Sequence, residues 1–193
     1  MSQLTREKLY SLEDYAVCRD QFRAKVMEHK KLRRLPLGDH AALYFEDELT
    51  MQYQVQEMLR IEKIFEADGI QEELDVYNPL IPDGQNLKAT FMIEFADINE
   101  RKAALAKMIG IENQLYIQVA EFEKVYAIAN EDLDRSSDEK TSSVHFVRFE
   151  LSPEMISAAK QGASILAGTE HDAYRVETRI EGEIRRSLVG DLH

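Results

Sequence analysis

The sequence predicts an α+β protein. A helical segment over residues 1–86 precedes a ferredoxin-like βαββαβ-type sandwich over residues 87–181 with one extra strand. Apolar residues recur at helical spacing early in the chain, whereas from residue 87 onward they alternate with polar residues, as in half-buried strands. Two strong helix starts, at Asp97 and Ser152, separate the strand-like segments. We expect residues 1–86 and 87–193 to form one cooperative domain.

The N-terminal segment contains two predicted helices. Ser11, with Asp14 three residues later, resembles a capping box and predicts a helix that starts there and ends before a proline and a glycine. The second helix is predicted over residues 50–67. A short strand over residues 41–45 lies between them, and residues 75–86 form an irregular, proline-containing connector. We expect the helices to cover the sheet or to pack beside it.

The sandwich prediction depends on two strand–helix–strand units. The predicted strands cover residues 87–95, 114–120, 124–129, 144–151 and 173–181. One helix starts at Asp97, and the other starts at Ser152 and is expected to end at Gly168. Residues 183–192 are predicted to be a short docked helix, and the polar, acidic residues 130–143 an exposed loop. This element order is that of a ferredoxin-like sandwich.

The charge of the chain limits its partners. The formal net charge is −12 and the pI is about 4.9, so the surface repels nucleic-acid phosphates and anionic lipids. No apolar stretch approaches about 18 residues, the length of a membrane span. The single cysteine, Cys18, cannot form an internal disulfide, which predicts a cytoplasmic protein. Its position among apolar residues of the first helix favours a small buried hydrophobe over a reactive thiol.

Polar residues interrupt the apolar stripe of the predicted second helix. At helical spacing this stripe consists of Met51, Val55, Met58, Ile61 and Phe65. Gln54 and Glu62 fall inside it, Glu57 lies at its flank, and Arg60 lies near its outer face. A buried carboxylate needs a cation, hydrogen-bond donors, a metal or a proton. Either Glu62 belongs to an internal polar site, or it lies at the edge of the stripe and reaches solvent or an arginine.

An internal Glu62 requires a partner from the sandwich. Arg148 and Arg175 are the expected candidates, because a guanidinium can bind a carboxylate through two parallel hydrogen bonds. Two histidines and a tyrosine are further site candidates. His145 shares a strand face with apolar residues, so it is either a hydrogen-bonded core histidine or a ligand or acid–base group. His171 lies in the loop that enters the last strand, just before Tyr174.

The common catalytic and cofactor motifs are missing from the sequence. It contains neither a glycine-rich phosphate loop, nor a Gly-x-Ser-x-Gly elbow, nor a Cys-x-x-Cys pair. It also lacks a His-Glu-x-x-His helix, and none of its helices carries the Glu-x-x-His pattern of di-iron bundles. The aromatic residues are not interleaved with a basic face, which argues against single-strand nucleic-acid binding.

Four motifs, "TMQYQVQEMLRIEK", "YNPLIP", "SSVHF" and "HDAY", occur in an order that resembles a bacterial family catalogued as domain of unknown function 3501. The resemblance extends from "REKLYSLEDY" to "VGDL". The last motif usually reads His-Pro-Ala-Tyr, so Asp172 stands here in place of a proline. The matching polar positions are Gln54, Glu57, Arg60, Glu62, Asn78, His145, His171 and Tyr174. Genes of this family often lie beside those for rubrerythrin and an iron–sulfur oxidoreductase, which implies a role in peroxide or oxygen defence.

Three functions follow as hypotheses. The first is an accessory or interaction protein of a redox system associated with rubrerythrin, with an apolar or acidic docking face and possibly an oligomeric state. The second is a metal- or small-molecule-binding enzyme in which Glu62, His145 and His171 converge on one pocket. The third is a binding module for an organic ligand held between sheet and helices, which an unfilled apolar pocket would favour.

Overall fold

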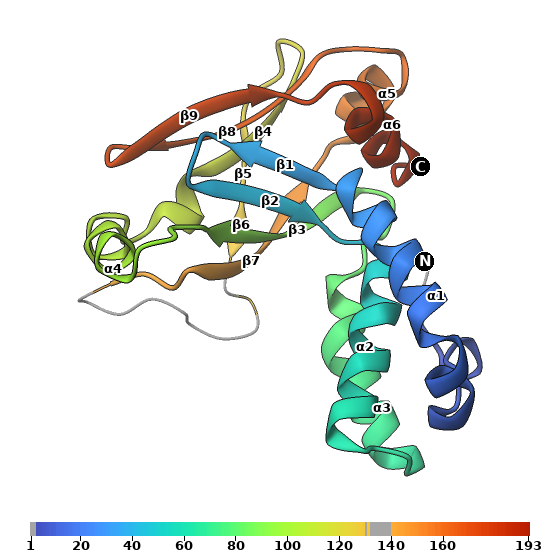
Figure 1. Cartoon of the computed structure of the whole chain (residues 1–193). Helices are drawn as coiled ribbons and strands as arrows, with labels where there is room; N and C mark the ends of the chain where they lie inside the picture. Colours follow the sequence, from blue (N-terminus) through green and yellow to red (C-terminus); the bar gives the residue numbers. More distant parts are fainter. Residues whose placement is uncertain (1–2, 130, 132–139) are drawn as a thin grey trace.

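The computed structural model describes residues 3–129, 131 and 140–193 and confirms the α+β class (Figure 1). The helices are α1 (Leu12–Lys31), α2 (Glu48–Glu62), α3 (Ala67–Tyr77), α4 (Ile98–Lys107), α5 (Pro153–Lys160) and α6 (Gly182–Gly190), and the short 3-10 turns are η1 (Arg6–Lys8), η2 (Asn78–Leu80) and η3 (Ile111–Gln114). The strands are β1 (Arg34–Leu37), β2 (Ala41–Phe45), β3 (Asn86–Ile93), β4 (Leu115–Val119), β5 (Val125–Tyr126), β6 (Ile128–Ala129), β7 (Val144–Glu150), β8 (Ile165–His171) and β9 (Tyr174–Arg179). Within these described residues, none of the helices is long and apolar enough to cross a membrane.

The strands form two antiparallel sheets that share one apolar core. The first sheet has the order β1-β2-β3-β7-β6, and the second has the order β5-β4-β8-β9. Alternate residues of β3, such as Leu87 and Phe91, are buried against Ile117 of β4 and Ile165 of β8. Helices α5 and α6 close one end of this sandwich (Figure 1). Burial of apolar side chains between two sheets supplies the main driving force for the fold.

The predicted ferredoxin-like topology is not confirmed, because the strands are divided between two sheets. The segment that was predicted to continue a helix up to Gly168 instead forms β8, after α5 has ended at Lys160. Gly168 is required for close packing, since a Cβ atom there would lie 2.4 Å from the carbonyl oxygen of Val176 and 2.8 Å from the hydroxyl of Tyr116. Glycine within a strand often marks such a close approach rather than a helix end.

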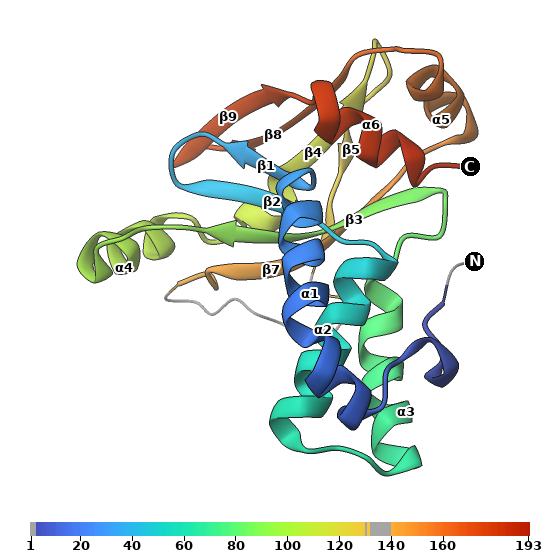
Figure 2. The same cartoon turned by 45° about the vertical axis from the view of Figure 1, so that its right-hand side comes forward.

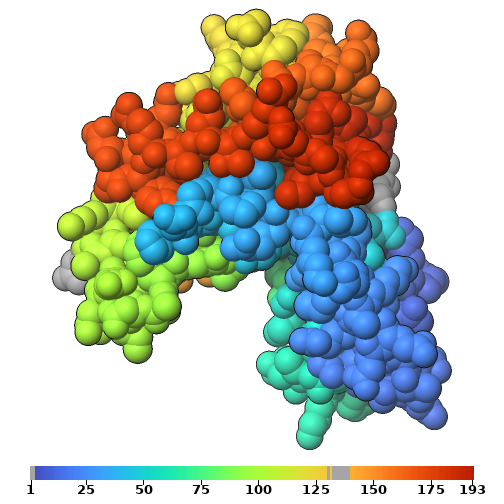
Figure 3. All heavy atoms as spheres, turned by 45° about the horizontal axis from the view of Figure 1, so that its top comes forward, coloured from blue at the N-terminus to red at the C-terminus, as the bar shows by residue number. Residues whose placement is uncertain are grey.

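The N-terminal segment contributes strands as well as helices. Predicted strand 41–45 is confirmed as β2, and β1 was missed; β2 pairs with β3 across the predicted division at residue 86. Three helices, α1, α2 and α3, lie side by side and project from the sandwich as a separate lobe, which we call the arm (Figures 2 and 3). The first of them confirms the prediction, because Ser11 accepts a hydrogen bond from the Asp14 amide.

Two further predictions require correction. The helix predicted over residues 50–67 ends at Glu62, where Lys63 adopts a left-handed conformation with φ of 56°, and α3 then occupies part of the predicted connector. Sequence signals for helix ends favour glycine at such a position, so a lysine gives no warning. Of the loop predicted over 130–143, residues 130 and 132–139 lie outside the described residues, whereas Thr141 is buried.

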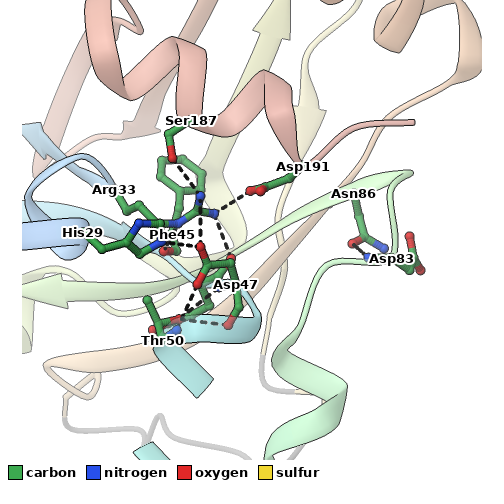
Figure 4. Close-up of polar contacts among 10 residues, drawn as sticks. His29, Arg33, Phe45, Asp47, Thr50, Asp83, Asn86, Ser187 and Asp191 are labelled. Carbon is green, nitrogen blue, oxygen red and sulfur yellow. Dashed lines mark hydrogen bonds and ion pairs between the residues drawn. The ribbon is translucent and has the colours of Figure 1, made fainter. Parts of the chain in front are cut away.

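A buried arginine joins the arm to the sandwich. Arg33, which is 2% exposed, donates hydrogen bonds to the backbone oxygens of Phe45 and Glu46, to Ser187 and to Asp191 (Figure 4). It also lies 3.4 Å from Asp47, the N-cap of α2, which pairs in turn with His29 of α1. Burial would raise the pKa of Asp47, but Arg33, the Thr50 amide and His29 together lower it. The network therefore connects α1, α2 and α6.

Candidate functional site

The residues predicted to form one polar site lie in three separate places. Gln54, Glu57, Arg60 and Glu62 all belong to α2 in the arm. His145 lies near the start of β7, in the first sheet. His171, the last residue of β8, and Tyr174, the first residue of β9, lie together in the second sheet.

Glu57 connects α1 and α2 through a partly buried cluster. Its carboxylate accepts hydrogen bonds from Nε and Nη2 of Arg19, both at 2.8 Å, and from the Tyr15 hydroxyl at 2.7 Å. Arg60 adds an ion pair at 3.3 Å. The Arg19 guanidinium, with the Tyr15 hydroxyl and Arg60, lowers the pKa of Glu57 to about 2 despite its partial burial. Because these groups bind one another, the cluster acts as a lock between the two helices.

Glu62 is exposed, so the prediction of an internal site around it is wrong. The buried face of α2 contains Met51, Val55 and Leu59, which follow one another at intervals of four residues. The predicted stripe was centred too far round the helix, toward residues that later proved exposed. The expected partners are also engaged elsewhere: Arg148 pairs with Glu131 and Glu150, and Arg175 pairs with Asp172.

The buried polar residue of α2 that sequence reasoning missed is Gln56. Its side chain is fully buried and accepts a hydrogen bond from the Tyr10 amide at 2.6 Å, while its Nε2 lies 3.4 Å from the Tyr10 carbonyl oxygen. Gln54, one of the predicted site residues, is only half-buried. Gln56 thus fixes the chain before α1 against α2. Its position beside Val55 on the true apolar face was the signal that could have identified it.

His145 lies inside the sandwich, as its apolar strand face predicted. Its side chain is fully buried, and Nε2 lies 2.9 Å from Thr141 Oγ1 and 3.0 Å from the carbonyl oxygen of Ser142. Glu112, which is also buried, has a carboxylate oxygen 3.9 Å from the same nitrogen and accepts a hydrogen bond from Thr141. This geometry is that of a hydrogen-bonded core histidine that holds η3 against β7.

His171 and Tyr174 fasten the β8–β9 hairpin to its neighbours. His171 Nε2 lies 3.1 Å from the carbonyl oxygen of Ile109, and Nδ1 accepts a hydrogen bond from the Ala173 amide. This arrangement fits a neutral imidazole protonated on Nε2. The Tyr174 hydroxyl donates to the Leu37 carbonyl oxygen at 2.6 Å and accepts from the His40 amide, so it links the second sheet to the β1–β2 turn.

The predicted convergence of Glu62, His145 and His171 on one pocket has no support in the geometry. The three side chains lie on an exposed helix end, inside the first sheet and at a hairpin of the second. Over residues 3–129, 131 and 140–193, no group of three or more histidine, cysteine, aspartate or glutamate side chains could hold a metal ion. The one cysteine, Cys18, is half-buried against aromatic residues of α1 and α2.

The end of the arm farthest from the sandwich exposes large apolar side chains, and we call it the arm tip (Figure 1). Phe65 is 72% exposed and Ile61 is 59% exposed. Phe65 also lines a hollow of about 300 Å³ together with Tyr10 and Ile70, between the start of α1 and the α2–α3 turn. An exposed phenylalanine beside an apolar hollow is a feature of interaction surfaces rather than of ordinary protein surface.

Carboxylates surround this apolar tip. Residues 59–73 contain five acidic side chains and two basic ones. Partial burial raises the pKa of Glu73, and the neighbouring carboxylates Glu62 and Glu72 raise it further. The carboxylates are therefore close enough to create a local negative potential around Phe65. Glu62 contributes to this surface charge instead of to an internal site.

A second candidate, the helix–sheet cavity, lies between the arm and the outer face of the first sheet. It has a volume of about 550 Å³ and mostly apolar walls. Its lining comprises Glu46, Asp75, Val76, Tyr77, Pro79, Leu80, Lys88, Ala89, Glu131, Phe146, Val147 and Arg148. Two of the motifs singled out in the sequence, "YNPLIP" and "SSVHF", contribute residues to these walls. No predicted site residue lines this cavity, because its polar groups come from strands whose outer face looked solvated.

Comparison with known proteins identifies the family. A family model described as Protein of unknown function (DUF3501) matches residues 3–192. The chain belongs to the DUF3501 family. A crystal structure of a novel protein of unknown function from Burkholderia pseudomallei K96243 is similar over 100% of both chains, with 50% identity and a TM-score of 0.93. None of the curated proteins matches the sequence. Membership in DUF3501 confirms the resemblance of the four motifs.

Proposed function

We propose that this DUF3501 protein is a cytoplasmic accessory protein of a redox or peroxide-defence system and that it binds its partner through the arm tip. The observation that supports the proposal is the exposed Phe65, which lies beside an apolar hollow and is surrounded by carboxylates. Exposed aromatic side chains at the centre of a surface patch commonly carry most of the binding energy of an interface.

The charge around the tip defines the kind of partner. A surface with Glu62, Glu66 and Asp68 near Phe65 complements a protein that presents lysines or arginines around an apolar pocket. We propose rubrerythrin or the iron–sulfur oxidoreductase as this partner, because the family resemblance implies both. Attraction between exposed charges is screened by salt, so association should slow as ionic strength rises.

Titration calorimetry of the purified chain with each of these two proteins tests the proposal. We expect binding to one of them, and we expect Phe65→Ser to weaken it at least about tenfold, the effect of a central aromatic contact. Val17→Ser is the matched control, since Val17 is an 87% exposed apolar residue of α1 that does not line the tip hollow. It should leave the affinity unchanged.

Two outcomes would contradict the proposal in different ways. If the chain binds neither redox protein, the partner assignment is wrong. If Phe65→Ser and Val17→Ser bind a partner as tightly as the unaltered chain, the arm tip is not the docking surface. Light scattering of the chain alone is needed as well, because concentration-dependent dimerisation that Phe65→Ser abolishes would assign the tip to self-association instead.

A further inference from the structure

The walls of the helix–sheet cavity suit a flat ring system. Tyr77 and Leu80 line it from the arm, and Phe146 lines it from β7 of the first sheet. The cavity thus has aromatic side chains from two different layers of the molecule. Its volume of about 550 Å³ falls within the usual range of small-molecule sites. Aromatic walls favour ring-shaped ligands because rings stack on them with little loss of side-chain freedom.

One charged group in the cavity wall is a lysine with hydrogen-bonding capacity to spare. Lys88 Nζ donates to the carbonyl oxygens of Pro79 at 2.7 Å and of Ile81 at 2.9 Å. An ammonium group has three N–H donors, so these two carbonyls leave one donor for an acceptor in the cavity. Burial lowers the pKa of Lys88, which shows that its ammonium is partly desolvated. A hydrogen bond from such a group is stronger than one made in water.

The second charged group is a carboxylate next to this lysine. Glu46 is 7% exposed, and its two oxygens accept hydrogen bonds from Thr50 at 2.6 Å and from Thr90 at 2.7 Å. The Glu46 amide donates to the Lys88 carbonyl oxygen, so both residues are cross-strand neighbours that line the same cavity. A carboxylate can accept about four hydrogen bonds, so each Glu46 oxygen has room for a ligand donor.

We propose that the helix–sheet cavity binds an uncharged aromatic heterocycle whose polar edge carries a carbonyl oxygen beside an N–H group. The carbonyl oxygen accepts from Lys88, and the N–H donates to Glu46. An anionic ligand would meet the Glu46 carboxylate, and a cationic ligand would meet the Lys88 ammonium. A neutral cyclic amide or imide satisfies both groups at once. This binding site is separate from the arm tip, so neither proposal depends on the other.

Fluorescence titration with naphthalimide, a fused aromatic imide, tests this site. We expect it to bind the full chain, and we expect N-methylnaphthalimide, which lacks only the N–H donor, to bind at least about tenfold more weakly. Lys88→Met and Glu46→Gln should each weaken naphthalimide by a similar factor. Lys25→Met, which alters an exposed lysine of α1, serves as the control and should bind like the unaltered chain.

The comparison of the two imides uses the unaltered protein, so it remains decisive if Glu46→Gln fails to fold. Equal affinity for naphthalimide and its N-methyl derivative would overturn the proposed contact with Glu46. Tighter binding of naphthoate would instead assign the cavity to anions, and tighter binding of naphthylmethylamine would assign it to cations. Binding of none of these probes at millimolar concentration would overturn the proposal of an aromatic ligand altogether.

Discussion

The arm and the sandwich are stabilised in different ways. In the sandwich, side chains from both sheets and from α5 and α6 form one continuous apolar cluster. The arm has two small clusters instead, one around Leu74 and one around Tyr15, and it adds the Glu57 ion-pair cluster and the Arg33 junction. A region with few apolar contacts opens more readily than a continuous core. The arm is therefore the part of the molecule that we expect to open first.

Core substitutions in the two regions should have different reach. Phe91→Ala in the sandwich should lower the free energy of unfolding by about 3–5 kcal/mol and speed hydrogen exchange throughout the chain, because Phe91 is fully buried between the sheets. Leu74→Ala in the arm should cost about 2–5 kcal/mol but speed exchange mainly in α1, α2 and α3. Hydrogen exchange monitored by mass spectrometry would measure both patterns.

The comparison fails if Leu74→Ala accelerates exchange in β3 and β8 as much as in α2. That result would mean that arm and sandwich unfold only as one unit, as the single cooperative domain predicted from the sequence requires. Exchange that is faster in the arm of the unaltered chain would support separate opening.

The junction between the two regions should be the most sensitive polar site. Arg33→Met should destabilise the chain by about 3 kcal/mol, because it leaves Asp47 and Asp191 without their buried cation. Arg34→Met is the matched control, since Arg34 is 39% exposed and its ion pair with Glu94 should contribute less than about 1 kcal/mol. Urea unfolding of both variants would measure the difference, and equal destabilisation would refute the special role of Arg33.

Acid should weaken the arm through Glu57. Its pKa is lowered from 4.5 to about 2, so its stabilising contribution is present above pH 4.5 and is lost as the pH falls toward 2. Glu57→Gln should therefore lower the melting temperature at neutral pH and bring little change near pH 2. Glu13→Gln, at an exposed carboxylate of α1, should show no such dependence. A constant difference between Glu57→Gln and the unaltered chain over this pH range would contradict the assignment.

The link between the sheets should give the smallest effect. Tyr174→Phe removes the hydroxyl that donates to Leu37 and accepts from His40, at an expected cost of about 1 kcal/mol. The ring keeps its apolar contacts in the sandwich, so the variant should fold. Thermal unfolding would measure the shift, and exchange of the β1–β2 turn amides should become faster. No change in either quantity would mean that the hydroxyl does not hold the turn.

Local signals in the sequence predicted the individual elements well. Ser11, Asp97 and Ser152 each cap the helix that follows, because a short polar side chain can accept a hydrogen bond from an amide of the first turn. The alternation in residues 173–181 predicted β9 correctly. The strand β8 was missed because its glycine resembles a helix end. Only the contact of Gly168 with Val176 and Tyr116 shows why glycine is needed there.

The candidate site was harder to predict than the fold. Periodicity alone placed Glu62 on the wrong side of α2, because a helix made of many apolar residues permits more than one stripe. The lining of the helix–sheet cavity combines residues near positions 46, 77, 88 and 146, which no local pattern connects. Such a cavity exists only because the arm lies against the outer face of the first sheet.

The sequence by itself determined the α+β class, most helix starts, the buried position of His145 and the acidic character of the chain. These properties depend on neighbouring residues or on composition, so short stretches suffice to predict them. The tertiary structure alone decided that the strands form two sheets, that Arg33 is the buried charge to be neutralised, and that Glu62 faces solvent at the arm tip. Each of these depends on which distant segments meet, and that choice is made by the packing of the whole chain.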